Sequence, residues 1–312
     1  MLQQRRSPPT LIAVTMDDHS AANSATLWAT VQRRSTEALA KGALCPIETR
    51  CEEVEDAGVC FTLRVAANIA RKENSDTQHR RGDPFVPFEQ DLFVTDVGAT
   101  HVALLNKFSV LEHHLLVVTR EFEDQEALLT LADFQALSTF MAAYPALAFY
   151  NGGEVAGASQ HHKHLQVIPL PLGTPRRPVP IEPLLARVPA SDALARVPAL
   201  PFSNAFCRLP AGIFREPVAA AESLLTRYRN LLAAVGVEAV QAGDEVRQSM
   251  PYNLLLSTDW MLVVPRSREC YRNISVNALG YTGSFFLRDE QQLTAVREAG
   301  PMAVLRSVSV AP

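Results

Sequence analysis

One short segment constrains the fold more than any other part of the chain, because its polar and apolar side chains alternate. The segment runs from His161 to Val167 and reads H-H-K-H-L-Q-V. Side chains of a β-strand point alternately to its two faces. One face would carry His162, His164 and Gln166, and the other would carry Lys163, Leu165 and Val167. The second face favours packing in a core, so the segment predicts a strand that displays two imidazoles and an amide in a row.

Apolar runs predict the other elements of a mixed α and β protein. Strands are expected at residues 59–66, 101–106, 114–119, 252–256 and 261–264. Helices are expected at residues 25–40, 131–143 and 219–235, with Ser24 and Thr130 capping the first two. Short connections between successive apolar runs are typical of neighbouring strands. The expected fold class is therefore α+β, an antiparallel sheet with flanking helices.

A proline-rich stretch divides the chain. Residues 169–217 hold 11 of the 21 prolines, and the string L-A-R-V-P-A occurs there twice, at 185–190 and 194–199. This composition predicts an irregular crossover over residues 171–217. It would join an N-terminal half, 1–170, which contains the histidine row, to a C-terminal half, 218–312, which completes the fold. The two halves are expected to form one continuous unit, and whether they are duplicates stays open.

Charge and cysteine usage exclude several classes of protein. The formal net charge of −4 argues against a nucleic-acid partner, since nucleic-acid binders usually carry a basic excess. The five cysteines form no C-x-x-C pair, which argues against a disulfide framework or a zinc ribbon and favours a reducing compartment. No apolar run approaches the ~18 residues that can span a bilayer. We expect a cytoplasmic protein without a signal peptide or a membrane partner.

The row formed by His162, His164 and Gln166 has three interpretations. It could be a polar surface strand without a chemical role. It could be part of a zinc site, but zinc needs three or four ligands and no further ligands stand at metal spacing, so no protein metal site is expected. The third interpretation is nucleophilic catalysis, because a neutral imidazole attacks phosphorus well when an acceptor holds its other ring nitrogen. We favour the third.

The residues around this row resemble a known family. Residues 162–168 resemble the histidine-triad signature in its H-x-H-x-Q form. Together with F-Y-N-G-G at 149–153 and G-A-S-Q at 157–160, they resemble the ATP adenylyltransferase, or diadenosine tetraphosphate phosphorylase, family. Further similar stretches lie at 104–108, 113–122, 252–256, 260–267 and 275–280. The resemblance extends over residues 26–310 and implies a histidine-triad-like fold.

The resemblance implies a nucleotide-binding transferase that interconverts diadenosine tetraphosphate plus phosphate with ATP plus ADP. It implies that His164 is the nucleophile and carries AMP. Gln166 would contact the α-phosphate, and the main chain near His162 would orient the nucleophile. Ser159 and Gln160 would contact phosphate. His161 stands where the family has proline, and the alternation places it on the face opposite to His164.

A polyphosphate substrate needs local cations in a chain of net negative charge. The available cations are Arg71, Lys72, Lys107, Arg120, Lys163, Arg266, Arg268 and Arg272. Lys72 and Lys107 are favoured, because they lie in stretches that resemble the family. Asn106 and Asn151, short amides at strand ends, are candidates for contacts to ribose or phosphate.

Mg²⁺ or Mn²⁺ is expected to arrive with the polyphosphate and to be held mainly by it. Glu121, Glu123 and Asp124 could also bind such an ion, but three acids in a loop are usually just solvated. No organic cofactor is expected, and no G-x-x-x-x-G-K-[ST] loop occurs. Two rival functions remain: a hexose-1-phosphate uridylyltransferase, which uses a related histidine motif, and a nucleotide-binding protein without catalysis.

Overall fold

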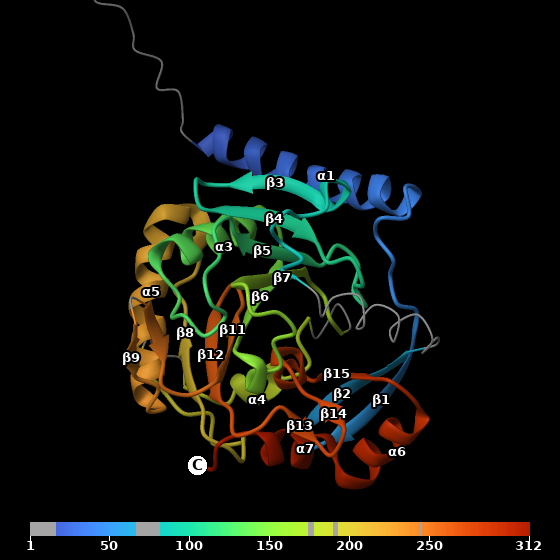
Figure 1. Cartoon of the computed structure of the whole chain (residues 1–312). Coiled ribbons are helices and arrows are strands. Elements are labelled where there is room, and N and C mark those ends of the chain that lie inside the picture. The colour runs from blue at the N-terminus through green and yellow to red at the C-terminus, as the bar shows by residue number, and fades with distance from the viewer. Residues whose placement is uncertain (1–16, 67–81, 174–177, 190–192, 244) are drawn as a thin grey trace, which may run out of the picture.

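The structure, a computed structural model, describes residues 17–66, 82–173, 178–189, 193–243 and 245–312. Its largest element is an eight-stranded sheet in which all neighbours are antiparallel. In spatial order its strands are β3 (Phe93–Val97), β4 (His101–Leu105), β5 (Leu115–Thr119), β7 (His164–Pro169), β6 (Ala146–Gly152), β11 (Tyr252–Leu256), β12 (Trp260–Pro265) and β8 (Ala205–Arg208). The two halves of the sequence therefore meet in this sheet, along the β6–β11 pair (Figure 1).

Three helices cover one face of this sheet. They are α1 (Asp17–Ala40), α3 (Leu131–Ala143) and α5 (Pro217–Ala234). Their buried side chains share one apolar cluster with Leu165 and Val167 of β7 and with Tyr150 of β6. The structure thus confirms that the odd-numbered apolar residues of the histidine segment face a core. Burial of such side chains contributes about 1.5–3 kcal/mol each, which anchors the strand beneath the site.

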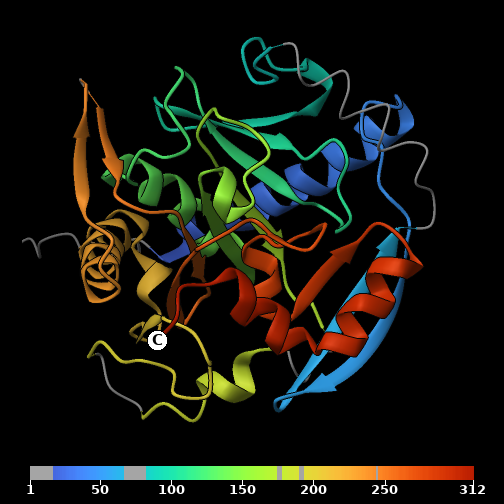
Figure 2. The same cartoon turned by 60° about the horizontal axis from the view of Figure 1, so that its bottom comes forward.

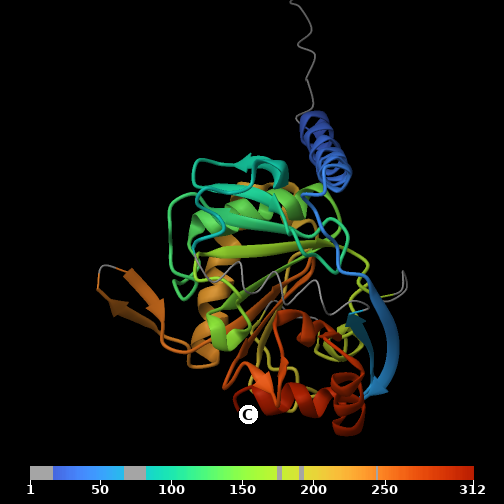
Figure 3. The same ribbon diagram turned by 45° about the vertical axis from the view of Figure 1, so that its right-hand side comes forward.

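A smaller layer covers part of the opposite face. It contains the sheet of β1 (Thr49–Asp56), β2 (Val59–Ala66) and β15 (Ser284–Leu287), together with α4 (Glu182–Leu185), α6 (Glu290–Ala299) and α7 (Pro301–Val308). The β2–β15 pair is parallel and joins an early strand to a late one. Figures 1 and 3 show this layer beneath the large sheet, away from α1.

Short elements complete the fold. The hairpin of β9 (Ala239–Ala242) and β10 (Glu245–Gln248) projects from the body in Figures 2 and 3. The other elements are β13 (Cys270–Tyr271), β14 (Ile274–Ser275) and the 3₁₀ turns η1 (Gln90–Leu92), η2 (Glu154–Ala156), η3 (Ile213–Arg215) and η4 (Ala278–Thr282). Among the described residues no helix is long and apolar enough to cross a membrane.

Most of the predicted elements are confirmed. The helix over 131–143 has the predicted Thr130 cap, and Asp133 answers it in a capping box that satisfies backbone groups at the helix start. Ser24 is not a cap, because α1 already begins at Asp17. The predicted crossover is only partly irregular, since it contains α4 and β8.

Strand β1 was missed. Its sequence T-R-C-E-E-V-E-D carries five charged residues, and as an edge strand it leaves alternate side chains in solvent. Charges at edges oppose pairing with other chains. They also hide the apolar alternation on which the sequence prediction of strands depends.

Candidate active site

The histidine row lies in the middle of the large sheet. His164 is the first residue of β7, which pairs with β5 on one side and β6 on the other. On this face one apolar cluster includes Phe149 and Ile168, and a second includes Val118. His164 and Gln166 lie between the two clusters and are 3% and 9% exposed. The polar row is thus set into an otherwise apolar face.

The His164 ring is held in one tautomer. Its Nδ1 donates to the carbonyl oxygen of His162 over 2.8 Å, which leaves the lone pair on Nε2. Burial lowers the pKa of His164 to about 4, and the charge of His162 acts in the same direction, whereas the His162 carbonyl opposes the shift. The ring is therefore neutral at pH 7, and Nε2 has no hydrogen-bond partner among the described residues. A neutral imidazole with a bare nitrogen is a nucleophile.

Gln125 fixes the backbone of the nucleophile and was missed by the sequence reasoning. Its Oε1 accepts from His164 N at 2.8 Å, and its Nε2 donates to Asn151 O at 2.8 Å. The side-chain amide therefore stands between β6 and β7 where their ladder ends, at the pair Phe149–Gln166. Gln125 itself is buried, in the loop before α3. No local pattern distinguishes it from its charged neighbours, so only the tertiary structure identifies it.

The orientation of the Gln166 amide follows from two further residues. Asn106 Nδ2 can only donate, so His114 Nδ1, 3.3 Å away, accepts and His114 Nε2 carries the hydrogen. That Nε2 donates to Gln166 Oε1 over 2.9 Å. Burial lowers the pKa of His114 to about 4, which keeps this neutral tautomer. The Nε2 group of Gln166 has no partner among the described residues and is free to donate to a ligand.

Asn151 flanks the nucleophile from the other side. The β6–β7 register, continued by two pairs beyond Phe149–Gln166, places it opposite His164 on the same face. Its Oδ1 accepts from Asn253 Nδ2 and from Ala278 N, both at 2.9 Å. Since both lone pairs are used, its Nδ2 hydrogens remain as the free donors. His164 thus lies between two amides whose oxygens are already bonded to the protein.

His162 is a fixed support. Its Nδ1 lies 2.6 Å from Asp83 Oδ2, and its Nε2 lies 2.8 Å from the carbonyl oxygen of Thr119. The ring of Phe85 contacts both His162 and His164, with centroid separations of 5.6 and 5.5 Å. His162 therefore has no free ring nitrogen, whereas His164 has one.

Lys163 points to the helix side of the sheet. It is fully buried, and its Nζ lies 3.0 Å from Asp133 and 2.9 Å from Glu123. Burial alone would raise the pKa of Asp133, but the hydrogen bond from His101 and the charge of Lys163 lower it to about 2. Lys163, one of the available cations, is therefore not free to bind phosphate, because its side chain points to the core as the alternation predicted.

Other sequence candidates have protein partners. Lys107 pairs with Glu89 at 2.6 Å, and Arg120 pairs with Asp96. Arg266 is 2% exposed and bonds only to protein groups, so it does not face a substrate. Of the acids considered for Mg²⁺, Glu123 is paired with Lys163, and Asp124 with Arg247 at 3.1 Å.

Three further candidates lie around the site or outside the described residues. Ser159 is exposed and Gln160 is half-buried, both in the loop before His162. His161, the departure from the family pattern, is exposed beside them. Lys72 lies outside the described residues, as does Arg71.

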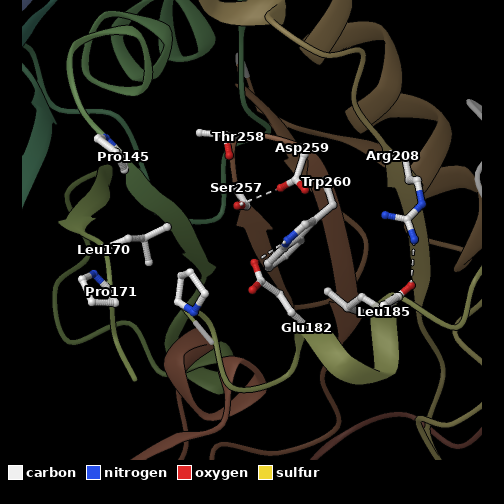
Figure 4. Close-up of a pocket in the computed structure, with 12 residues that line it drawn as sticks. Pro145, Leu170, Pro171, Glu182, Leu185, Arg208, Ser257, Thr258, Asp259 and Trp260 are labelled. Carbon is white, nitrogen blue, oxygen red and sulfur yellow. Dashed lines mark hydrogen bonds between the residues drawn. The ribbon is translucent and has the colours of Figure 1, made fainter. Parts of the chain in front are cut away.

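A cavity of about 610 Å³ lies elsewhere (Figure 4). Its lining includes Leu170 after the end of β7, Trp260, Glu182 and Arg208. None of the predicted site residues lines it. It lies toward the opposite end of β7 from His164, so the polar row and this cavity are separate features.

A buried neutral imidazole with a bare Nε2 lies between two amide donors on this antiparallel sheet, an arrangement suited to nucleophilic attack on phosphorus. A family model described as the Ap4A phosphorylase N-terminal domain matches residues 17–187, and one described as the ATP adenylyltransferase C-terminal domain matches residues 198–311. The chain therefore belongs to the Ap4A phosphorylase family of ATP adenylyltransferases. These models describe neither of the two rival functions, a hexose-1-phosphate uridylyltransferase or a nucleotide-binding protein without catalysis.

Individual relatives agree with this assignment. The chain is 27% identical to diadenosine 5′,5′′′-P1,P4-tetraphosphate phosphorylase 2 of Saccharomyces cerevisiae over 266 residues, which are 77% of this chain and 78% of that protein. The crystal structure of yeast Ap4A phosphorylase Apa2 superposes with a TM-score of 0.71 at 22% identity, covering 91% of this chain and 97% of that one. Apa2 in complex with Ap4A superposes with a TM-score of 0.69 at 22% identity, again covering 91% and 97% of the two chains. These superpositions confirm the fold.

Proposed function

We propose that this enzyme cleaves diadenosine tetraphosphate with phosphate to give ATP and ADP, and catalyses the reverse reaction, through an adenylate on His164. The observation that carries the proposal is the state of the His164 ring. Its Nδ1–H is held by the His162 carbonyl at 2.8 Å, and burial keeps the ring neutral. Its Nε2 can therefore attack phosphorus without first losing a proton.

The reaction would run in two successive displacements at the same phosphorus. His164 Nε2 forms a bond to an α-phosphorus of diadenosine tetraphosphate, and the bond from that phosphorus to the bridging oxygen breaks. ATP leaves, and AMP stays on the ring. An oxygen of phosphate then attacks the same phosphorus, the N–P bond breaks, and ADP leaves. The His162 carbonyl stabilises the positive charge that the ring carries while AMP is attached.

The two free amides would bind the phosphoryl oxygens. Gln166 Nε2 and Asn151 Nδ2 are donors whose partner oxygens are already bonded, so they need not reorganise during the reaction. Donors fixed before charge develops are the main source of rate in such sites.

We assign the remaining substrate contacts as follows. Ser159 and Gln160 would contact the phosphates next to the nucleophile. Lys72 and Lys107 would neutralise the distal phosphates, which requires Lys107 to leave Glu89. Asn106 would act through His114 and Gln166, because its amide is hydrogen-bonded to His114.

Mg²⁺ or Mn²⁺ would enter with the polyphosphate. No group of three or more His, Cys, Asp or Glu within the described ranges could hold a metal ion, so phosphate and water oxygens would supply most ligands. The ion would neutralise charge on the leaving phosphates. We also propose a cytoplasmic location, supported by the five cysteines, which form no disulfide within the described part of the chain.

Adenylation of a histidine tests the proposed function directly. The protein is incubated, without phosphate, with diadenosine tetraphosphate that carries a label in its adenosines, and is quenched in base, which phosphoramidates survive. The label is then mapped by mass spectrometry. We expect label on His164 and none after His164→Ala. His161→Ala is the matched control, since this neighbouring imidazole is exposed, and it should retain both label and turnover. Label on His161, or turnover without a labelled histidine, would refute the assignment.

A further inference from the structure

The C-terminal half contains a buried cation without a charged partner. Arg266 is 2% exposed, and every hydrogen-bond acceptor around it within the described residues is neutral. Its Nε donates to Val308 O at 3.1 Å, and its Nη2 donates to Arg268 O at 2.9 Å. Its Nη1 donates to Val276 O at 2.8 Å and to Asn253 Oδ1 at 2.7 Å. An unpaired buried charge is costly, so a role beyond packing is to be sought for it.

The bond to Asn253 begins a chain that leads to the nucleophile. Asn253 is fully buried, and with its oxygen bonded to Arg266 it can offer only Nδ2 to its other neighbours. That Nδ2 donates to Asn151 Oδ1 at 2.9 Å and to Ala156 O at 2.8 Å. Asn151 in turn lies opposite His164. A single residue, Asn253, therefore connects the guanidinium to an amide beside the reacting nitrogen.

A backbone group reinforces the end of this chain. Ala278 N also donates to Asn151 Oδ1, at 2.9 Å. The loop that supplies Ala156 is packed tightly against this segment, since a β-carbon on Gly157 would lie only 2.8 Å from Cα of Asn277. Gly157 has a φ of 89°, which favours glycine. The Asn151 amide is thus fixed from two directions and cannot turn over.

We propose that Arg266 and Asn253 are positioning residues that orient the Asn151 amide with its Nδ2 toward the phosphoryl oxygens and polarise its N–H bonds. The inference rests on the proposed adenylyl transfer. The positive guanidinium draws electron density through Asn253, and such polarisation strengthens each successive donor. The C-terminal half would contribute in this way to a reaction whose nucleophile belongs to the N-terminal half.

The test is a double-mutant cycle with Asn253→Asp and Asn151→Ala. A carboxylate at 253 keeps its bond to Arg266 but cannot donate to Asn151 Oδ1. The relay, by which we mean the hydrogen-bond chain from Arg266 through Asn253 to Asn151, is therefore broken, while the buried cation gains a charged partner. For phosphorolysis of diadenosine tetraphosphate we expect kcat to fall about a hundredfold or more, as when one fixed donor to a transition state is lost, and KM to change much less. Melting temperature reports folding separately.

The cycle separates positioning from a structural role. If Asn253 acts through Asn151, Asn253→Asp costs little more once Asn151→Ala is present. Additive losses, or wild-type kcat in the folded Asn253→Asp variant, would overturn the relay. Wild-type turnover is the reference arm, so failure of the proposed function appears there and not in the variants.

A second variant covers the case in which Asn253→Asp does not fold. Asn151→Asp keeps the acceptor that Asn253 and Ala278 need, but places a carboxylate oxygen where Nδ2 was. We expect a folded protein with at least a hundredfold lower kcat. A folded Asn151→Asp variant with wild-type kcat would show that Asn151 Nδ2 does not donate to the substrate. The proposal that Asn253 and Arg266 orient this group for catalysis would then be refuted.

Discussion

At the scale of single residues, the site depends on which nitrogen of each side chain carries hydrogen. His164 presents a bare Nε2, because its Nδ1–H is used by the His162 carbonyl. Gln166 presents hydrogens, because His114 occupies its oxygen. The first assignment follows from a partner two residues away in the sequence, and the second from a partner 52 residues away. A nucleophile and a donor are therefore built from residues whose side chains could each have served the opposite role.

We expect Gln166 to set the choice between transfer and hydrolysis. A glutamine amide cannot titrate, so it cannot exchange protons with an attacking water. Phosphate and ADP bring their own ionisable groups as acceptors. We expect Gln166→His, whose imidazole titrates near neutral pH, to raise phosphate-independent cleavage relative to phosphorolysis. Products are separated with and without phosphate, AMP reporting hydrolysis.

An unchanged product ratio in a folded, active Gln166→His protein would mean that water exclusion, and not Gln166, sets the choice. Wild-type enzyme is the control, and it should release ATP and ADP only when phosphate is present. Release of AMP by wild-type enzyme without phosphate would contradict the transferase assignment itself.

The two buried imidazoles should make the protein less stable in acid. Burial lowers the pKa values of His114 and His164 from 6.5 to about 4. Between these values the unfolded chain binds protons that the folded chain does not, so the free energy of unfolding falls as pH drops from 6.5 to 4. Each group accounts for a loss of about 3 kcal/mol.

Urea unfolding at several pH values measures this effect. His164→Gln should reduce the slope between pH 6 and 4.5 by up to about 1.4 kcal/mol per pH unit. His161→Gln, at an exposed position, should leave the slope unchanged. Equal slopes in all three proteins would mean that His164 titrates alike in the folded and unfolded states.

At the scale of elements, the site occupies the place where two strands separate. The β6–β7 ladder ends at Phe149–Gln166, and the Gln125 amide bonds to both strands just beyond it. Sequence alternation predicted the faces of β7 correctly, since period two depends only on the strand itself. It could not predict Gln125, because the loop before α3 reaches β7 only through the tertiary fold.

Gln125→Leu should damage both stability and rate. The substitution leaves His164 N and Asn151 O without their hydrogen-bond partners. Each buried unsatisfied group lowers the free energy of unfolding by about 1–3 kcal/mol. The strand end would shift, and a displacement of ~1 Å at the nucleophile costs on the order of 10²-fold in rate. Urea unfolding and kcat for phosphorolysis are measured beside Glu121→Gln, an exposed change in the same loop. Loss of stability with unaltered kcat would show that Gln125 does not position the nucleophile.

At the scale of the whole molecule, one sheet joins both halves of the sequence. Strands β11 and β12 extend the sheet beyond β6, and β8, from the crossover, is its edge strand. In the smaller layer β15 pairs with β2. Strand runs and helices could be recognised from the sequence because they are local patterns. The order of the strands in the sheet could not be recognised from the sequence, because it depends on tertiary contacts. The proximity of Asn253 and Arg266 to the site of His164 could therefore not be predicted either. Arg266 was therefore counted among the cations available to a substrate from its charge alone.

The N-terminal half supplies the nucleophile, and the C-terminal half supplies hydrogen-bond donors. We therefore expect one chain to carry one adenylate. All eight histidines lie at or before His164, so the C-terminal half has no imidazole to offer. The neighbouring β12 is buried and apolar along Trp260–Val264, and what β11 and the residues after it bring to the site are hydrogen-bond donors. Intact-protein mass spectrometry after incubation with excess diadenosine tetraphosphate, without phosphate and with the quench in base, should show one AMP per chain and none in His164→Ala. Two AMP groups on one chain would require a second nucleophile besides His164. A single AMP that persists in His164→Ala would move the reaction to another residue. One equivalent that is lost with His164 means that each molecule works through one imidazole, held by groups from both halves of its sequence.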